Sequence, residues 1–144
     1  LVGNLFSPAR GLFVFSPWLL IIFFRGRSWK PSTLEKIIML IILAHWLIIS
    51  MLEYWWGGHT FGPRYMSDML PFFMVLFGPA VGQLLETKKR LPVVAGALLL
   101  GGWSMFVHFK GATDWNTYVW NTVPNNIDQH PERIWDWHDP QFLR

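Results

Sequence analysis

Four ionisable side chains lie close together in the otherwise apolar and aromatic stretch EYWWGGHTFGPRYMSDMLPFF. They are Glu53, His59, Arg64 and Asp68. The planar guanidinium of Arg64 is suited to bind a phosphate through two parallel hydrogen bonds. Glu53 and Asp68 place a carboxylate on either side of this cation in the sequence. The stretch therefore predicts a site for a phosphate-bearing substrate.

Aromatic rings and glycines surround these charges. Trp55, Trp56 and Tyr65 offer flat faces for stacking on sugar rings or for anchoring in a membrane interface. A second interpretation also stays open, in which Arg64 only forms a structural salt bridge with one of the two carboxylates. The candidate substrate-binding residues are Glu53, Trp55, Trp56, His59, Arg64, Tyr65 and Asp68.

The composition of the chain is too apolar for an ordinary soluble domain. Of its 144 residues, 52% are hydrophobic, 17% are aromatic and only 15% are charged, against about 25% charged in typical soluble domains. The net charge of +3 comes without a basic patch, so no nucleic-acid partner is expected. Because cysteine is absent, disulfides and thiolate metal sites are excluded.

Four uncharged apolar runs predict an all-α, polytopic membrane protein fragment with about four transmembrane helices, since a span needs about 20 mostly apolar residues. The first run is short and contains Pro17, so it predicts a kinked span or a re-entrant segment. A soluble helical bundle is the alternative, but these runs would leave it almost no polar face. The transmembrane region is 1–109, with spans near 11–25, 36–54, 68–85 and 91–109.

Positive charges predict the orientation of these spans. Two connecting segments are rich in Lys and Arg, namely Arg25, Arg27, Lys30 and Lys36 in one and Lys88, Lys89 and Arg90 in the other. The segment between them, 54–67, has only Arg64. Because loops rich in Lys and Arg stay cytoplasmic, we expect a multi-pass protein of the inner (plasma) membrane with both ends extracytoplasmic. Residues 110–144 then form an irregular, tryptophan-rich extracytoplasmic tail.

Other polar and small residues give further expectations. His45 in the second run is either a functional group or a neutral histidine hydrogen-bonded to a neighbouring helix. Asp68 can cap the N-terminus of the third helix. Two pairs have the spacing that lets membrane helices approach closely, Gly78 with Gly82 and Ala97 with Gly101. Several tail residues match no metal-ligand spacing and predict a solvated loop, His130, Glu132, Asp136, His138 and Asp139.

Three stretches together resemble a known class of proteins: GNLFSPARGLFVFSPWLL, YWWGGHTFGPRYMSDMLPFF and PERIWDWHDPQFLR. They are similar to bacterial multi-pass membrane proteins of the GT-C class, which includes the dolichyl-phosphate-mannose-type protein mannosyltransferases. The resemblance covers nearly the whole chain as the C-terminal portion of a larger protein. It implies an all-helical glycosyltransferase that takes a sugar from a polyprenyl-phosphate carrier on the extracytoplasmic side. It also implies that Arg64 and its loop contact the carrier phosphate.

The catalytic carboxylate of that class lies on a first outward loop, upstream of these residues, so the resemblance assigns no catalytic residue here. A cofactor is open, with a divalent metal in the full-length protein as one candidate. The expected partners are membrane lipid and a polyprenyl-phosphate sugar donor. The alternative function is a non-catalytic membrane transport or scaffold protein whose loop binds lipid or a partner.

Overall fold

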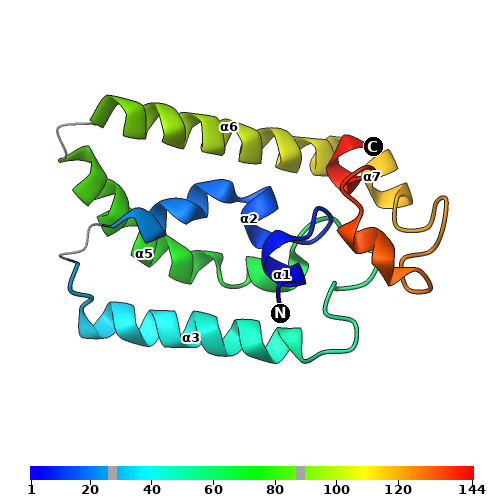
Figure 1. Cartoon of the computed structure of the whole chain (residues 1–144), viewed down its shortest axis with the longest axis horizontal. Coiled ribbons are helices and arrows are strands. Elements are labelled where there is room, and N and C mark those ends of the chain that lie inside the picture. Colours follow the sequence, from blue (N-terminus) through cyan, green and yellow to red (C-terminus); the bar gives the residue numbers. More distant parts are fainter. Residues whose placement is uncertain (26–28, 87–89) are drawn as a thin grey trace.

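The computed structural model describes residues 1–25, 29–86 and 90–144, and within them the chain is helical without a strand. The helices described are α1 (Gly3–Phe6), α2 (Leu12–Phe15), the 3-10 helix η1 (Pro17–Phe24), α3 (Thr33–Ser50), α4 (Arg64–Ser67), α5 (Leu70–Leu85), α6 (Arg90–Thr113), α7 (Asn116–Val119) and the 3-10 helices η2 (Pro131–Trp135) and η3 (Gln141–Leu143). The two longest, α3 and α6, lie on opposite sides, with α2, η1 and α5 between them (Figure 1).

The short helices and both termini lie toward one end of the long helices α3, α5 and α6 (Figure 1). We call this the loop end, because it also holds residues 51–63, and it includes the tail, 110–144. At the opposite end, α5 finishes and α3 and α6 begin (Figure 1). The N-terminal segment, the loop that carries the candidate site and the tail are therefore neighbours in space.

The prediction of about four transmembrane helices is wrong. Within the described residues, only α3 and α6 are long and apolar enough to cross a membrane. The first apolar run is divided into α2 and η1, and α5 has 16 residues. At about 1.5 Å per residue α5 is about 24 Å long, less than the roughly 30 Å of a bilayer core. The chain is mostly a small globular helical fold with two candidate spans.

The physical reason for this error is that hydropathy counts apolar residues without showing where the backbone leaves the helix. Pro17 lacks an N–H and begins the tighter η1 helix, so the first run never becomes one long α-helix. The second span was expected to continue to residue 54, but α3 ends at Ser50. Its start is set by a capping box, in which Ser32 Oγ accepts from the Glu35 N–H and Glu35 Oε2 accepts from the Ser32 N–H.

Three hydrophobic clusters hold the molecule together. The largest joins α2, η1, α3, α4 and α5 through side chains such as Leu19, Ile38 and Phe73. The loop end has a separate cluster: Ala9, Trp56, Trp120, Ile127 and Ile134. The third cluster consists of Phe15, Val107 and Phe142, and it ties α2 and η3 to α6. The loop end therefore has its own hydrophobic core, distinct from the core between the long helices.

The small residues expected at helix contacts face open space instead. A Cβ added to Gly78, Gly82 or Gly101 would have no heavy atom within 4 Å. Ala97 and Gly101 line an open cavity of about 550 Å³ beside Trp18 of η1. The spacing predicted a close approach of backbones at these residues, but they border open space and a cavity instead.

Candidate functional site

Arg64 is exposed at the first position of α4 and forms no side-chain hydrogen bond or ion pair with any described residue. The turn that presents it depends on Gly62, whose φ of +68° is a left-handed conformation open to glycine. Glu53 and Asp68 are exposed as well and do not pair with it. The alternative of a structural salt bridge is therefore not what the described residues adopt.

The predicted capping role of Asp68 is wrong. Asp68 ends the short helix α4, and α5 begins at Leu70 with Met69 as a cap residue that provides no side-chain bond. The additional turn of helix formed by α4 was not expected from the sequence. Because of it, Asp68 is the C-cap residue of α4 and not the N-cap residue of α5.

The two tryptophans of the opening stretch pack inward. Trp56 is only 7% exposed, and its indole Nε1 donates to Asp128 Oδ1 at 3.1 Å. Trp55 packs edge to face on Trp56, with 6.0 Å between ring centroids, and its ring covers Gly3 so closely that a Cβ there would lie 2.1 Å from it. Trp56 therefore has no free face for a sugar, and Trp55 is half-buried in the loop-end core.

Tyr65 is half-buried against the largest cluster, and its carbonyl accepts from His45 Nε2 at 2.7 Å. The expected hydrogen bond between His45 and a neighbouring helix is thus confirmed, since Tyr65 belongs to α4. This bond anchors the backbone one residue after Arg64.

His59 is bound to the tail. Its Nε2 lies 3.1 Å from Asn126 Oδ1 and 3.2 Å from Asp128 Oδ2, so this nitrogen carries the proton and donates. Asp128 therefore receives hydrogen bonds from both Trp56 and His59. The composition of the tail did not single out Asp128, because its partners are some 70 residues earlier in the chain.

Arg10 is the buried centre of the loop end. It is 1% exposed, and every arm of its guanidinium donates. Its acceptors are Trp56 O at 2.9 Å, Ala9 O at 2.8 Å, Gly58 O at 3.2 Å, Gln141 Oε1 at 2.5 Å and Asn121 Oδ1 at 2.7 Å. Burial lowers the pKa of Arg10 to about 9, against the opposing attraction of Asp128. The side chain is thus still protonated at neutral pH and binds three separate segments.

Gln141 completes this network from the other end of the chain. Its Nε2 donates to Thr60 O at 2.9 Å and Thr117 O at 2.8 Å, while its Oε1 also accepts from the Gly62 N–H at 3.4 Å. Arg10 and Gln141 both occur in stretches that carry the family resemblance, ARGLF and DPQFL. An isolated arginine before a long apolar run was the available signal, and it was missed.

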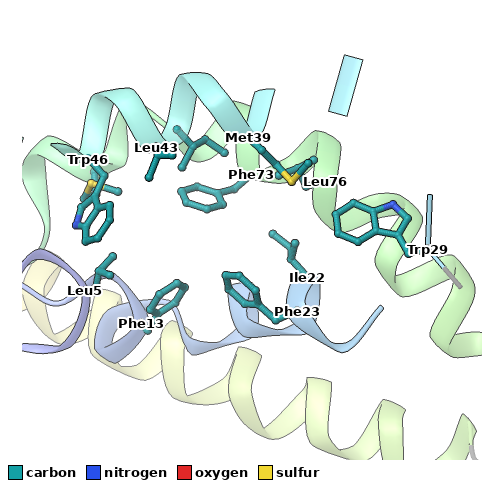
Figure 2. Close-up of a pocket in the computed structure, with 12 residues that line it drawn as sticks. Leu5, Phe13, Ile22, Phe23, Trp29, Met39, Leu43, Trp46, Phe73 and Leu76 are labelled. Carbon is teal, nitrogen blue, oxygen red and sulfur yellow. The ribbon is translucent and has the colours of Figure 1, made fainter. Parts of the chain in front are cut away.

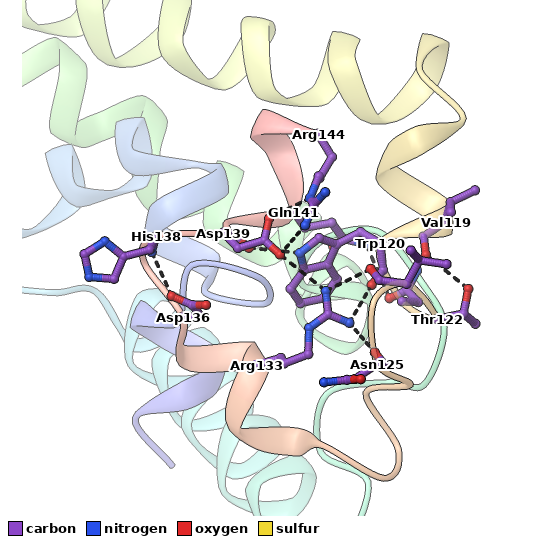
Figure 3. Close-up of polar contacts among 12 residues, drawn as sticks. Val119, Trp120, Thr122, Asn125, Arg133, Asp136, His138, Asp139, Gln141 and Arg144 are labelled. Atoms are coloured by element: carbon purple, nitrogen blue, oxygen red, sulfur yellow. Dashed lines mark hydrogen bonds and ion pairs between the residues drawn. The ribbon is translucent and has the colours of Figure 1, made fainter.

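The tail is irregular, as expected, but it is built around a buried aromatic ring. Arg133 stacks on Trp120 with 4.5 Å between its Cζ and the ring centroid, and it donates to Trp120 O at 2.9 Å (Figure 3). Trp120 Nε1 in turn donates to Asp139 O at 2.9 Å. Arg144 closes the structure with two 2.6 Å hydrogen bonds to the carboxylate of Asp139.

The ionisable residues of the tail do not gather into a metal site. In the described residues there is no group of three or more His, Cys, Asp or Glu side chains placed to hold a metal ion. His130 Nδ1 pairs with Glu132 Oε1 at 2.9 Å, and Asp136 accepts from the His138 backbone N–H at 2.8 Å. These contacts join residues two positions apart and stabilise local turns.

No protein-family model matches the chain, and no curated protein or solved structure matches it either. The likeness to GT-C glycosyltransferases is therefore carried by its three sequence stretches alone. Among the seven candidate residues, Arg64, Glu53 and Asp68 are exposed and available to a ligand, while Trp56 and His59 are engaged with the tail.

Proposed function

We propose that this chain is part of an integral membrane protein that binds a polyprenyl-phosphate sugar at its loop end, with Arg64 holding the phosphate. The observation that carries the proposal is the state of Arg64, an exposed planar cation without a partner among the described residues. By contrast, Arg10 and Arg133, which also lie in the loop end, donate hydrogen bonds to acceptors within the protein. A guanidinium left free can offer two parallel donors to phosphate oxygens.

The membrane location is supported by the surfaces of α3 and α6. Only 11% of each candidate span is buried, and Leu40 on α3 and Leu98 on α6 are 65% and 71% exposed. A core helix of a soluble protein would instead be mostly buried. Large exposed apolar faces of this kind fit lipid better than water.

We further propose a multi-pass protein of the inner membrane with the loop end extracytoplasmic. The support is the distribution of Lys and Arg in the sequence, which is rich in these residues at 25–36, before α3, and at 88–90, where α6 begins. Arg27, Lys88 and Lys89 lie outside the described residues. Arg25, Lys30 and Lys36 still give that end a positive character.

The loop that presents Arg64 is held in one conformation before any ligand arrives. Gln141 fixes the backbone at Thr60 and Gly62, and His45 fixes it at Tyr65. A pre-organised loop loses less conformational entropy on binding, so more of the phosphate interaction contributes to affinity.

A second candidate function is a non-catalytic membrane protein whose loop end binds lipid or a partner. It is favoured by the burial of Trp56 and the bonding of His59 to Asp128, which remove two of the predicted sugar contacts. Sugar release from the bound donor by the full-length protein would support the enzyme, and donor binding without release would support this alternative.

The binding test compares the full-length protein with Arg64→Ala and Arg64→Lys in a polyprenyl-phosphate-sugar binding assay. Losing a hydrogen bond to a charged group costs about 1.5–3 kcal/mol, so Arg64→Ala should bind roughly ten- to a hundredfold more weakly. Lysine should restore little, because a compact ammonium cannot bind in bidentate geometry. Lys30→Ala, another exposed cation but at the opposite end, is the matched control. Unchanged affinity in folded Arg64→Ala would refute the proposal.

A further inference from the structure

Two cavities lie on either side of η1, one toward α3 and the other toward α6. The cavity toward α3 has a volume of about 380 Å³ and is lined by side chains such as Phe13, Leu43 and Phe73 (Figure 2). None of its lining residues carries a titratable group, so nothing in it selects one apolar ligand over another. The cavity toward α6 differs in this respect, because a histidine lines it.

The cavity toward α6, which we call the α6 cavity, has a volume of about 550 Å³ and a mostly apolar lining. Trp18 of η1 and Phe77 of α5 contribute to it, and α6 contributes residues from Ala97 to His108. At 1.5 Å per residue, this part of α6 is about 16 Å long. The cavity opens to the surface, since Met105 lines it and is 76% exposed. A hydrocarbon chain can therefore enter from the side and lie along α6.

His108 is the titratable group of this cavity. The residue is exposed, and its Nε2 lies 3.4 Å from Ser16 Oγ, which is a long hydrogen bond. With the Ser16 hydroxyl donating to Nε2, the neutral ring carries its proton on Nδ1. Nδ1 has no hydrogen-bond partner among the described residues. Ser104, a second polar side chain of the lining, already donates to Leu100 O at 3.0 Å. The Nδ1–H of His108 is therefore a donor that a ligand can use.

The position of His108 along α6 suits the ester group of a lipid. The 24 residues of α6 form about 36 Å of helix, and the hydrocarbon core is roughly 30 Å thick, so a span of this length extends slightly beyond the core at each end. His108 lies about 7.5 Å before the end of α6 at Thr113. In the proposed membrane location it is then just inside the border of the hydrocarbon core, close to the level at which acyl chains join their ester groups.

We propose that the α6 cavity holds one acyl chain of a phospholipid from the extracytoplasmic leaflet, with the ester carbonyl accepting a hydrogen bond from His108 Nδ1. The inference rests on the proposed membrane location. In hydrocarbon a polar group without a partner is costly, and an ester carbonyl is an acceptor that can pair with this N–H. A polyprenyl chain has no acceptor at this depth, so a phospholipid matches the cavity better than the proposed sugar donor does.

The experiment counts phospholipid retained by the full-length protein in detergent by native mass spectrometry. The probes are dioleoyl phosphatidylglycerol and its diether analogue, which lacks the ester carbonyls. Gly101→Leu fills the cavity, because Gly101 lines it and an added Cβ would meet nothing within 4 Å. Gly102→Leu is the matched control, since Gly102 is equally open but does not line the cavity. His108→Phe removes the N–H, and His138→Phe, at an exposed histidine of the tail, is its control.

We expect the native protein to retain one diester phospholipid. Binding should be roughly two- to tenfold weaker in His108→Phe, which corresponds to the loss of one neutral hydrogen bond. The diether analogue should bind the native protein with a similar loss. His108→Asn keeps an N–H donor at the position of Nδ1 and should bind like the native protein. Gly101→Leu should bind roughly tenfold or more weakly.

Three results would overturn the proposal, each with folding verified by thermal melting. The first is equal phospholipid retention in Gly101→Leu and Gly102→Leu. The second is a diether analogue or a polyprenyl phosphate that binds the native protein as tightly as the diester. The third is no retained lipid together with a lower melting temperature in Gly101→Leu than in Gly102→Leu, which would assign the cavity to another segment of protein.

The outcome stays separate from that of the proposed function. Membrane fractionation tests the location, and sugar-donor binding by Arg64→Ala tests the phosphate site. A protein that fractionates with membranes and retains no phospholipid would refute the lipid site alone.

Discussion

Two arginines of this chain show how environment decides the role of one residue type. Arg10 is buried and donates to five oxygens, whereas Arg64 is exposed and its side chain donates to no described residue. A buried charge is tolerated only when it is fully hydrogen-bonded, so the surroundings of Arg10 must be built for it. An exposed arginine without a partner is free to bind an external anion.

Replacing Arg10 by methionine should strongly destabilise the loop end. The change leaves buried acceptors such as Asn121 Oδ1 and Gln141 Oε1 without their donor. The expected loss is about 3 kcal/mol or more in the free energy of unfolding, measured by denaturant unfolding in detergent. Arg64→Met, at an exposed site that forms no side-chain bond within the described part of the chain, should stay within about 0.5 kcal/mol of the native protein. Equal destabilisation by the two variants would contradict the structure.

Asp139 makes the fold of the tail sensitive to acid. Burial alone raises the pKa of its carboxyl, but hydrogen bonds and charge from Arg144 and Arg133 outweigh this and hold the pKa below its ordinary value. A carboxyl whose folded pKa is lowered stabilises the fold fully above its unfolded pKa of about 3.9. That stabilisation is lost as the pH falls through the folded pKa.

The tail should therefore keep its protection from hydrogen exchange from neutral pH down to about pH 4 and lose it below that. In Asp139→Asn this acid-dependent loss should be absent and protection should be lower at every pH. The exposed Asp68, which has no partner among the described residues, supplies the control Asp68→Asn. A control that changes the acid response as much as Asp139→Asn would argue against this role.

Among the elements, α6 combines two different surroundings along one helix. Near its C-terminus, Gly111 lies so close to the Phe61 ring that an added Cβ would be 2.1 Å away. Near its middle, a Cβ on Gly101 would meet nothing within 4 Å. The first region is tied to the loop end and the second is open, as α3 is along most of its apolar face.

Alanine at these two glycines should thus have opposite effects. Gly111→Ala forces the Phe61 ring to shift and should lower the free energy of unfolding by about 1–3 kcal/mol. Gly101→Ala adds a better helix former without a clash and should be neutral or stabilising by up to about 1 kcal/mol. Thermal melting of the two variants in the same detergent tests this, and a Gly111→Ala protein as stable as Gly101→Ala would exclude the close contact.

At the scale of the whole molecule, buried polar side chains and exposed apolar side chains occupy different parts along the direction of the long helices. The loop end contains the buried hydrogen-bond network, while α3 exposes leucine and isoleucine and α6 exposes leucine, methionine and phenylalanine. In the proposed membrane location, the loop end would lie in water and the exposed apolar faces of α3 and α6 would contact lipid. Arg64 lies in the loop end, so the proposed membrane location would place it beside the bilayer and not within it.

The orientation can be tested with single cysteines at exposed, described positions. A membrane-impermeant thiol reagent outside intact cells should label Thr122→Cys in the tail. It should not label Lys30→Cys or Glu86→Cys, which lie beside the segments rich in Lys and Arg. Permeabilised cells provide the control, since all three cysteines should then react. Labelling of Lys30→Cys or Glu86→Cys in intact cells would reverse the proposed orientation.

The sequence by itself determined the helical character and the apolar composition of α3 and α6, and it left the hydrogen bond of His45 to a neighbouring helix as one of two alternatives. The first two follow from local composition, because long runs of apolar residues favour helix without knowledge of distant partners. It also placed Arg64 in a loop, whereas the structure has it exposed at the first position of the short helix α4. It could not show that α3 ends at Ser50 or that α5 is short, because helix ends depend on caps and on packing.

Only the tertiary structure decided what the loop end does with its polar groups. Arg10 and Gln141 are 131 residues apart in the chain, yet their side chains share a 2.5 Å hydrogen bond. Asp128 similarly reaches Trp56 and His59 from the tail and removes them from the predicted sugar site. No local pattern encodes such pairs, because each depends on how the whole chain closes on itself. That closure decided that Arg10 is buried and that Arg64 is exposed.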